Sequence, residues 1–277
     1  MHAKQMTDAV RAELRSLGID PDSDDLQQQL QFTRSGRIRV LLGDSFKTKL
    51  GEVREVLTAI MYLAPEKESG FNTCAFATNC ATVCIKKTGR MPTPASRRAR
   101  ISKTVLLNMF PEAFMAQLRM ELSQHCYLAK VKGMKPAIRP NGTSDVLWER
   151  YGFMEDFPDL QFYDYTKVPL DRRSPPDNYH LTYSLSEDPK SMGRALEYLK
   201  AGHNAAVVVQ SADGMTRATA KAAVAAMLER GSWLGFPVIS GDNDDSRFWD
   251  PPGHWVALYA KGPATKDISG FVQRLSA

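Results

Sequence analysis

Three cysteines of this 277-residue chain lie within eleven residues, with the spacing Cys74-x5-Cys80-x3-Cys84. Three thiolates on one loop can bind three irons of a [4Fe–4S] cluster and leave the fourth iron open, whereas an electron carrier normally uses four cysteines. An open iron can bind a substrate directly. The cysteines therefore predict a site-differentiated cluster of the kind that an iron–sulfur enzyme needs.

Two other interpretations of the cysteines stay open, a structural zinc ion and a role without metal. Zinc needs a fourth ligand, and no paired CxxC or HxxxH motif lies nearby, although His180 could supply one from a distance. Disulfides are not expected, because four cysteines are too few for a disulfide framework and the cytosol is reducing. Arg90 follows the cysteines and is a candidate to stabilise a negatively charged cluster or a bound phosphate.

The fourth cysteine belongs to a different pattern. Phe114, Leu118, Leu122 and Cys126 recur every four residues, which is the spacing of one face of a helix. A free cysteine in such an apolar stripe behaves as a small buried hydrophobic residue. We therefore place Cys126 in the core and not in the site.

The elements expected around the cysteines alternate between strands and helices, which is typical of an α/β protein with a parallel sheet. The expected strands cover residues 36–42, 137–138, 160–163, 179–183, 205–209, 237–239 and 255–259. The expected helices cover residues 44–59, a long stretch after Pro94 whose second half starts at Pro111, and residues 145–151, 191–200 and 216–229. This order predicts a complete or partial (β/α) barrel similar to a TIM barrel, with a doubly wound open sheet as the alternative.

The domain organisation follows from the same elements. We expect a helical N-terminal extension over residues 1–35 and a single barrel-like domain over residues 36–277. That domain carries the cysteines on a loop at residues 72–90.

Polar residues follow several of the expected strands. Ligands of parallel α/β folds bind at the carboxyl ends of the strands, so these side chains should meet at one face. Carboxylates and a lysine there can position a substrate or transfer protons. The candidate catalytic residues are Asn141, Asp145, Asp164, Lys167, Ser184 and Glu187.

The acidic run GDNDDSR at residues 241–247 raises a further possibility, a divalent metal site. It lacks the ligand spacing and the terminal glutamate of a calcium loop. The alternative is that Asp242 and Asp245 pair with Arg247 or face the mouth of the barrel.

Several segments of the chain are together distinctive: LAPEKESGFNTCAFATNCATVC, RARISKT, RPNGTSDVLWE, FYDYTK, NYHLTYSLSE and GDNDDSRFWDP. Over roughly residues 40–275 they resemble a family of uncharacterised bacteriophage proteins, distantly similar to radical-SAM-like iron–sulfur TIM barrels. The resemblance implies an iron–sulfur barrel, a phage origin and S-adenosylmethionine as a further candidate ligand. The x5 and x3 spacing of the cysteines is wider than the Cys-x3-Cys-x2-Cys of radical SAM enzymes.

Charge and composition leave a second class of function open. The net charge is +5, and Arg97, Arg98, Arg100 and Lys103 lie close together in one segment. A basic helix of this kind could contact nucleic acid, so the alternative is a binding protein stabilised by a structural cluster or zinc. The leading hypothesis, an enzyme, implies a small-molecule or nucleotide substrate.

Other classes are excluded by missing motifs. The chain has no Ser/His/Asp or Cys/His hydrolase signature, no GxGxxG and no GxxxxGK[ST]. No apolar run reaches the roughly 20 residues of a membrane-spanning helix, and no signal-peptide core is present. We therefore expect a cytoplasmic protein, in the host cytoplasm if a phage encodes it.

Overall fold

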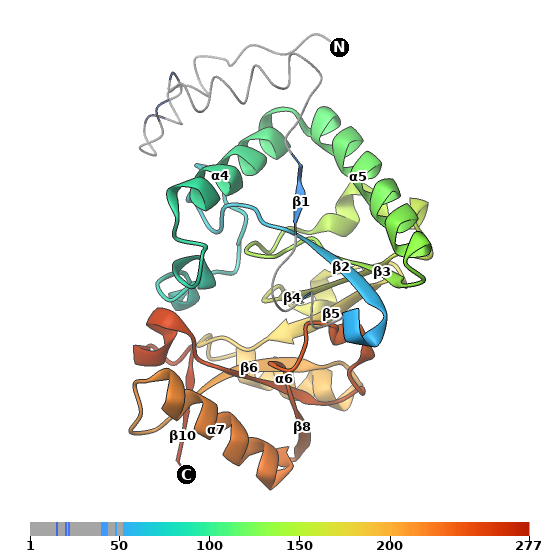
Figure 1. The fold of residues 1–277 in the computed structure, drawn as a ribbon. Coiled ribbons are helices and arrows are strands. Elements are labelled where there is room, and N and C mark those ends of the chain that lie inside the picture. The colour runs from blue at the N-terminus through green and yellow to red at the C-terminus, as the bar shows by residue number, and fades with distance from the viewer. Residues whose placement is uncertain are drawn as a thin grey trace.

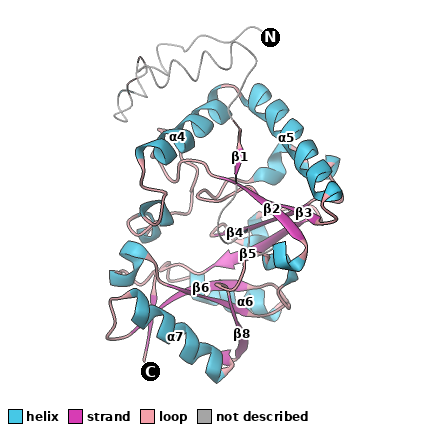
Figure 2. Ribbon diagram, viewed as in Figure 1, coloured by secondary structure: helices cyan, strands magenta, loops and turns pink. Residues whose placement is uncertain are grey.

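The structure is a computed structural model that describes residues 52–276, together with residues 15, 20, 22, 40–43 and 48. A mostly parallel sheet runs through the middle of this part of the chain, with the helices packed beside it (Figures 1 and 2). Most of the expected helical extension over residues 1–35, and most of the helix expected from residue 44, lie outside the described residues.

The described elements confirm an α/β protein. The strands are β1 (Leu42–Gly43), β2 (Val56–Met61), β3 (Lys135–Arg139), β4 (Gln161–Thr166), β5 (Tyr179–Ser184), β6 (Ala205–Ser211), β7 (Ser232–Trp233), β8 (Phe236–Ser240), β9 (Trp255–Tyr259) and β10 (Gln273–Leu275). The α-helices are α4 (Pro94–Met109), α5 (Pro111–Val131), α6 (Ser191–Lys200) and α7 (Arg217–Arg230). None of the helices described is both long enough and apolar enough to cross a membrane.

The strand order is β1-β2-β3-β4-β5-β6-β9-β8-β7, and β10 pairs with the last residues of β6. Every pair from β2 to β8 along this order is parallel, while β1 and β7 are antiparallel at the two edges. In the described part of the chain the two edge strands do not pair with each other. The sheet is therefore open in the described residues, and the expected complete or partial barrel is not confirmed.

Strand β2 corrects one expected element. Val56, Leu57 and Ile60 lie at helical spacing, and on that basis we expected a helix over residues 44–59. The segment Val56–Met61 is instead a strand in which every residue is buried. A parallel strand covered on both faces carries a continuous apolar run, and periodicity alone cannot distinguish such a run from a buried helix.

The helices pack against one face of the sheet. Tyr179, Leu181 and Tyr183 alternate along β5, so their side chains point to the same side. Tyr179 and Leu181 belong to the core cluster that includes residues of α4 and α5, and Tyr183 belongs to the cluster that includes residues of α6 and α7. This one-sided arrangement differs from a doubly wound sheet, in which helices cover both faces.

The helix boundaries follow local signals. Thr93 caps α4 through its side chain, which accepts a hydrogen bond from the Ser96 backbone N–H. Pro111 occupies the first position of α5 as expected, and Pro94, which was expected to precede its helix, is the first residue of α4. The segments expected at residues 191–200 and 216–229 are helices α6 and α7. The one expected at residues 145–151 forms only a short 3-10 helix, Trp148–Tyr151. Cys126 packs against the apolar core as expected.

A buried carboxylate on α5 fixes edge strand β1 and the residue before it. Glu121 accepts hydrogen bonds from the backbone N–H groups of Leu41 and Leu42, each at 2.9 Å. Lys103 on α4 donates to the Leu41 carbonyl at 2.6 Å, and burial lowers its pKa to about 8, although the charge of Glu121 opposes that shift. Removing Glu121 would leave two backbone donors without their acceptor and would remove the negative charge that favours the buried ammonium of Lys103.

We expect Glu121→Ala to lower the free energy of unfolding by about 2–4 kcal/mol, because breaking a buried charged network leaves its partners unsatisfied. Urea denaturation measures this change. Gln124→Ala, at an exposed position of the same helix, is the control and should shift stability by less than about 0.5 kcal/mol. Equal effects of the two substitutions would contradict the role of Glu121.

Candidate functional site

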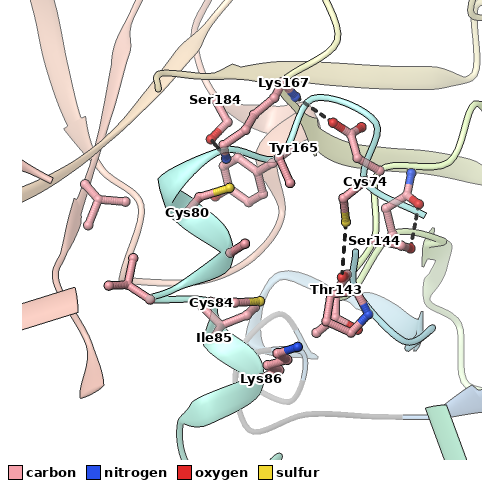
Figure 3. Close-up of a pocket in the computed structure, with 18 of the residues that line it drawn as sticks. Cys74, Cys80, Cys84, Ile85, Lys86, Thr143, Ser144, Tyr165, Lys167 and Ser184 are labelled. Atoms are coloured by element: carbon pink, nitrogen blue, oxygen red, sulfur yellow. Dashed lines mark hydrogen bonds between the residues drawn. The ribbon is translucent and has the colours of Figure 1, made fainter. Parts of the chain in front are cut away.

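A cavity of about 390 Å³ lies at the carboxyl ends of the parallel strands (Figure 3). Cys74, Cys80 and Cys84 line it from the long loop that follows β2. Residues that end or follow β3, β4 and β5 line it from the sheet, among them Asp145, Lys167 and Ser184. The cavity thus occupies the position at which parallel α/β folds bind ligands.

The cysteine loop is anchored at its beginning by hydrogen bonds. Thr73 Oγ1 donates to the Ala64 carbonyl at 2.6 Å, and the Asp145 backbone N–H donates to the Thr73 carbonyl at 2.8 Å. The second bond ties the cysteine loop to the loop after β3. The two loops therefore form adjoining walls of the cavity.

Ion pairs of Glu68 hold the cysteine loop at a second point, six residues before Cys74. Glu68, whose side chain is buried, pairs with Arg97 at 3.1 Å, Arg100 at 3.7 Å and Lys86 at 3.8 Å. Two of the basic residues considered for nucleic-acid binding are thus engaged in the fold, and Lys103 is engaged as described above. These contacts account for much of the basic segment by internal pairing, and nucleic-acid binding stays a prediction.

The thiols of the site are free and partly buried. Burial raises the pKa of Cys74 to about 11 and also raises the pKa of Cys84, which the backbone hydrogen bond and the ammonium group of Lys86 partly oppose. Cys74 Sγ lies 3.9 Å from the Thr143 carbonyl, to which it donates. Protonated thiols are poor nucleophiles, and a metal that binds them must displace their protons.

The described side chains contain no group of three or more His, Cys, Asp or Glu residues gathered closely enough to hold one metal ion. A mononuclear zinc site needs its sulfur ligands within about 4 Å of one another, because each Zn–S bond is about 2.3 Å. In an iron–sulfur cluster each thiolate binds a different iron, so the sulfurs surround the cluster at wider separations. His180 lies on β5 and does not line the cavity.

Three of the predicted catalytic residues, Asp145, Lys167 and Ser184, line the cavity, and Figure 3 shows the contact between the side chains of Lys167 and Ser184. Asp145 accepts hydrogen bonds from Thr166 Oγ1 and from the Lys167 backbone N–H, both at 2.8 Å. Lys167 Nζ donates to Ser184 Oγ at 3.1 Å. Burial raises the pKa of Asp145, and the hydrogen bond from Lys167 opposes that shift.

Asn141 also lines the cavity, but its side chain is buried and engaged. Its Oδ1 accepts hydrogen bonds from Ser144 Oγ at 2.8 Å, the Val146 backbone N–H at 2.9 Å and Trp148 Nε1 at 3.0 Å. Its Nδ2 donates to the Val146 carbonyl at 3.0 Å. We therefore interpret Asn141 as the residue that shapes this loop.

The other predicted site residues lie outside the lining. Asp164 is fully buried and accepts hydrogen bonds from the Asn141 backbone N–H at 2.9 Å and from Tyr179 Oη at 2.8 Å. Glu187 accepts one from the Asn79 backbone N–H at 2.6 Å, next to Cys80. Arg90 is exposed and does not contribute to the lining.

The structure adds lining residues that are not among the predicted catalytic residues. Arg139, Tyr165 and Asp245 line the cavity, with Arg139 Nη1 at 3.1 Å from Asp245 Oδ2, and for Asp245 this agrees with the alternative that it faces the site. Lys261 also lines the cavity. It follows the expected strand 255–259 by two residues, so the argument from strand ends could have identified it. Phe271 lines the cavity from the C-terminal segment, and no sequence signal indicated it.

The acidic run after β8 forms ion pairs. Asp242 Oδ1 pairs with Lys261 at 2.7 Å, Asp244 pairs with Arg247 at 3.4 Å, and Asp245 pairs with Arg139. Opposite charges thus account for these carboxylates, and Asp245 pairs across the fold with Arg139 in place of its expected partner Arg247.

An open, mostly parallel α/β sheet with a cysteine-lined cavity at its strand ends defines the class of protein. The sequence model of a family described as Gene product 88 matches residues 38–275, and the chain belongs to that family. This membership is consistent with the expected bacteriophage relatives. No curated protein and no solved structure matches the chain, so the expected likeness to radical-SAM-like barrels stays a prediction.

The buried Asp164 generates a test that depends on pH. Burial raises its pKa to about 7, against the opposing charge of Arg139, while the unfolded chain has the ordinary value near 3.8. Between these values the folded state binds the additional proton, so this group's contribution to stability falls as the pH rises. We expect the stability advantage of the wild type over Asp164→Asn to shrink between about pH 4 and pH 7.

Urea denaturation of both proteins across this pH range measures the difference, in which other titrating groups cancel. A difference that stays constant or grows with pH would show that the ionised carboxylate is the favoured form in the folded state.

Gly142 gives a steric test of the contact between the loop after β3 and strand β2. A Cβ at Gly142 would lie 2.6 Å from Ile60 Cγ2 and 2.8 Å from the Met61 carbonyl oxygen. We expect Gly142→Ala to cost about 1–3 kcal/mol of stability through overpacking. Gly193→Ala in α6, where a Cβ would meet nothing within 4 Å, should instead stabilise by about 0.5–1 kcal/mol. Thermal denaturation of the two variants distinguishes these signs.

Proposed function

We propose that this protein is an iron–sulfur enzyme that binds a [4Fe–4S] cluster through Cys74, Cys80 and Cys84 and acts on a small polar substrate in the adjoining cavity. The observation that carries the proposal is the position of the three thiols. They lie on the loop after the first parallel strand and line the same cavity as the polar residues at the strand ends. We propose further that the open sheet is a partial (β/α) barrel with this site at its mouth.

The residues present suit a cluster with one open iron. The three thiols are free, and they line one cavity from a single loop. Three thiolates would bring negative charge into a partly buried site, and the charges of Lys86 and Lys167 partly oppose the rise that burial causes in the pKa of Cys84. Cationic side chains of this kind stabilise thiolate ligands.

The chain's own groups would prepare the substrate. The carboxylate of Asp145 is fixed by two hydrogen bonds, and Lys167 Nζ shares a hydrogen bond with Ser184 Oγ. These groups can orient a polar ligand, and a proton can move between Lys167 Nζ or Ser184 Oγ and that ligand. A bound cluster would supply either electron transfer to S-adenosylmethionine or Lewis-acid activation of a substrate oxygen.

The test is to purify the protein without oxygen and to measure its iron, sulfide and visible absorbance. We expect about four irons per chain and a broad band near 400 nm, both strongly reduced in Cys74→Ala, Cys80→Ala and Cys84→Ala. Cys126→Ala is the matched control, because Cys126 packs on α5 against the core, and this variant should keep the full iron content.

The outcomes separate the hypotheses. One zinc per chain in a colourless protein would favour the alternative, a binding protein with a structural metal. Metal-free protein, or equal loss of iron in the Cys126→Ala control, would overturn the proposal. If the cluster is present, the change that S-adenosylmethionine causes in the electron paramagnetic resonance signal of the reduced cluster tests whether it binds there.

A further inference from the structure

Lys167 holds its ammonium group at a fixed place in the cavity wall. Its Nζ donates to Ser184 Oγ at 3.1 Å and lies 4.9 Å from the centre of the Phe271 ring. Its backbone N–H is held by Asp145. Contact with an aromatic face and a hydrogen bond restrict a flexible side chain, so the charge is presented before any ligand arrives.

The other cations that line the cavity each lie beside a carboxylate, although Lys86 shares Glu68 with Arg97 and Arg100. Lys86 pairs with Glu68 at 3.8 Å, Arg139 with Asp245 at 3.1 Å and Lys261 with Asp242 at 2.7 Å. In the described part of the chain Lys167 has no such ion pair.

The carboxylate nearest to Lys167 in the chain has its own cation. Asp145 lies 3.7 Å from Arg173 Nη1, and its two oxygens already accept hydrogen bonds from Thr166 Oγ1 and the Lys167 backbone N–H. The charge of Lys167 is therefore less compensated than that of the other cavity cations.

Ser184 adds a second donor beside the ammonium. Its Oγ accepts the hydrogen bond from Lys167, and no described group accepts a bond from its O–H. Ammonium groups carry three donors, so Lys167 keeps two for a ligand. Phe271 lies beside the ammonium, and Val208 and Leu258 add apolar surface elsewhere in the same cavity; an apolar lining strengthens an electrostatic contact.

We propose that Lys167 Nζ and Ser184 Oγ form an oxyanion-binding subsite, so that the substrate carries a carboxylate or a phosphate. This inference deepens the proposed function by naming the substrate class. The subsite itself is built from β4, β5 and their following residues, and it exists without a cluster. An anion bound there would place the rest of the molecule in the cavity that the three cysteines line.

The test uses metal-free protein, reduced with dithiothreitol and dialysed free of chelator, in a buffer of low ionic strength. Isothermal titration calorimetry with sodium phosphate and with sodium acetate measures binding. Backbone amide NMR shifts of Lys167 and Ser184 locate it. We expect saturable binding of at least one anion, weakened about tenfold or more by Lys167→Met and less strongly by Ser184→Ala. The preferred anion distinguishes a phosphate from a carboxylate substrate.

Lys87→Met is the matched control, because Lys87 is exposed and lies outside the cavity lining, and it should leave the dissociation constant within about twofold. Unchanged binding by Lys167→Met, equal weakening by Lys87→Met, or no saturable binding to the wild type would each overturn the subsite. Anion binding by a protein that never acquires iron would support the subsite while the proposed function fails. If the protein acquires a cluster but its metal-free form binds no anion, the proposed function is supported and the subsite is overturned.

Discussion

The buried carboxylate of Asp164 is the interaction on which the geometry of the cavity depends. It lies on β4 and accepts hydrogen bonds from the Asn141 backbone N–H and from Tyr179 Oη. Asn141 in turn binds Ser144, Val146 and Trp148 through its side-chain amide. One buried acceptor thus sets the path of the loop after β3, and Asp145 at the end of that loop bonds to the residue before Cys74. The thiols and the strand ends are positioned together.

Ion pairs hold the rest of the site in place. They also distinguish the charged groups that serve the fold from those that are able to bind a ligand. Glu68 gathers three cations at the start of the cysteine loop, and the acidic run after β8 pairs with Arg139, Arg247 and Lys261. Taking a charge out of water is costly unless a partner compensates for it. Most charges around the cavity have such partners, and their presence is explained by the fold.

The sequence predicted the elements that carry strong local signals. Helices α6 and α7 and the proline-initiated pair α4 and α5 lie where their spacing and caps indicated. The prediction of a helix where the chain forms strand β2 was wrong, because a buried apolar run is equally compatible with a helix and a strand. Strand ends brought Asp145, Lys167 and Ser184 to one cavity, since parallel strands align their carboxyl ends. The pairing of Arg139 with Asp245 joins residues 106 positions apart, and no local pattern indicates such a contact.

Lysines of the same cavity differ in their capacity to bind an anion, because their partners in the protein differ. A lysine paired with a carboxylate, such as Lys261 with Asp242, has exchanged its hydration for an ion pair, so a further anion gains little from it. Lys167 has exchanged part of its hydration for a hydroxyl and an aromatic ring, neither of which carries a charge. Its remaining attraction for an anion is therefore unused in the protein alone. That unused attraction is what a binding site provides, because only interactions completed by the ligand contribute to its affinity.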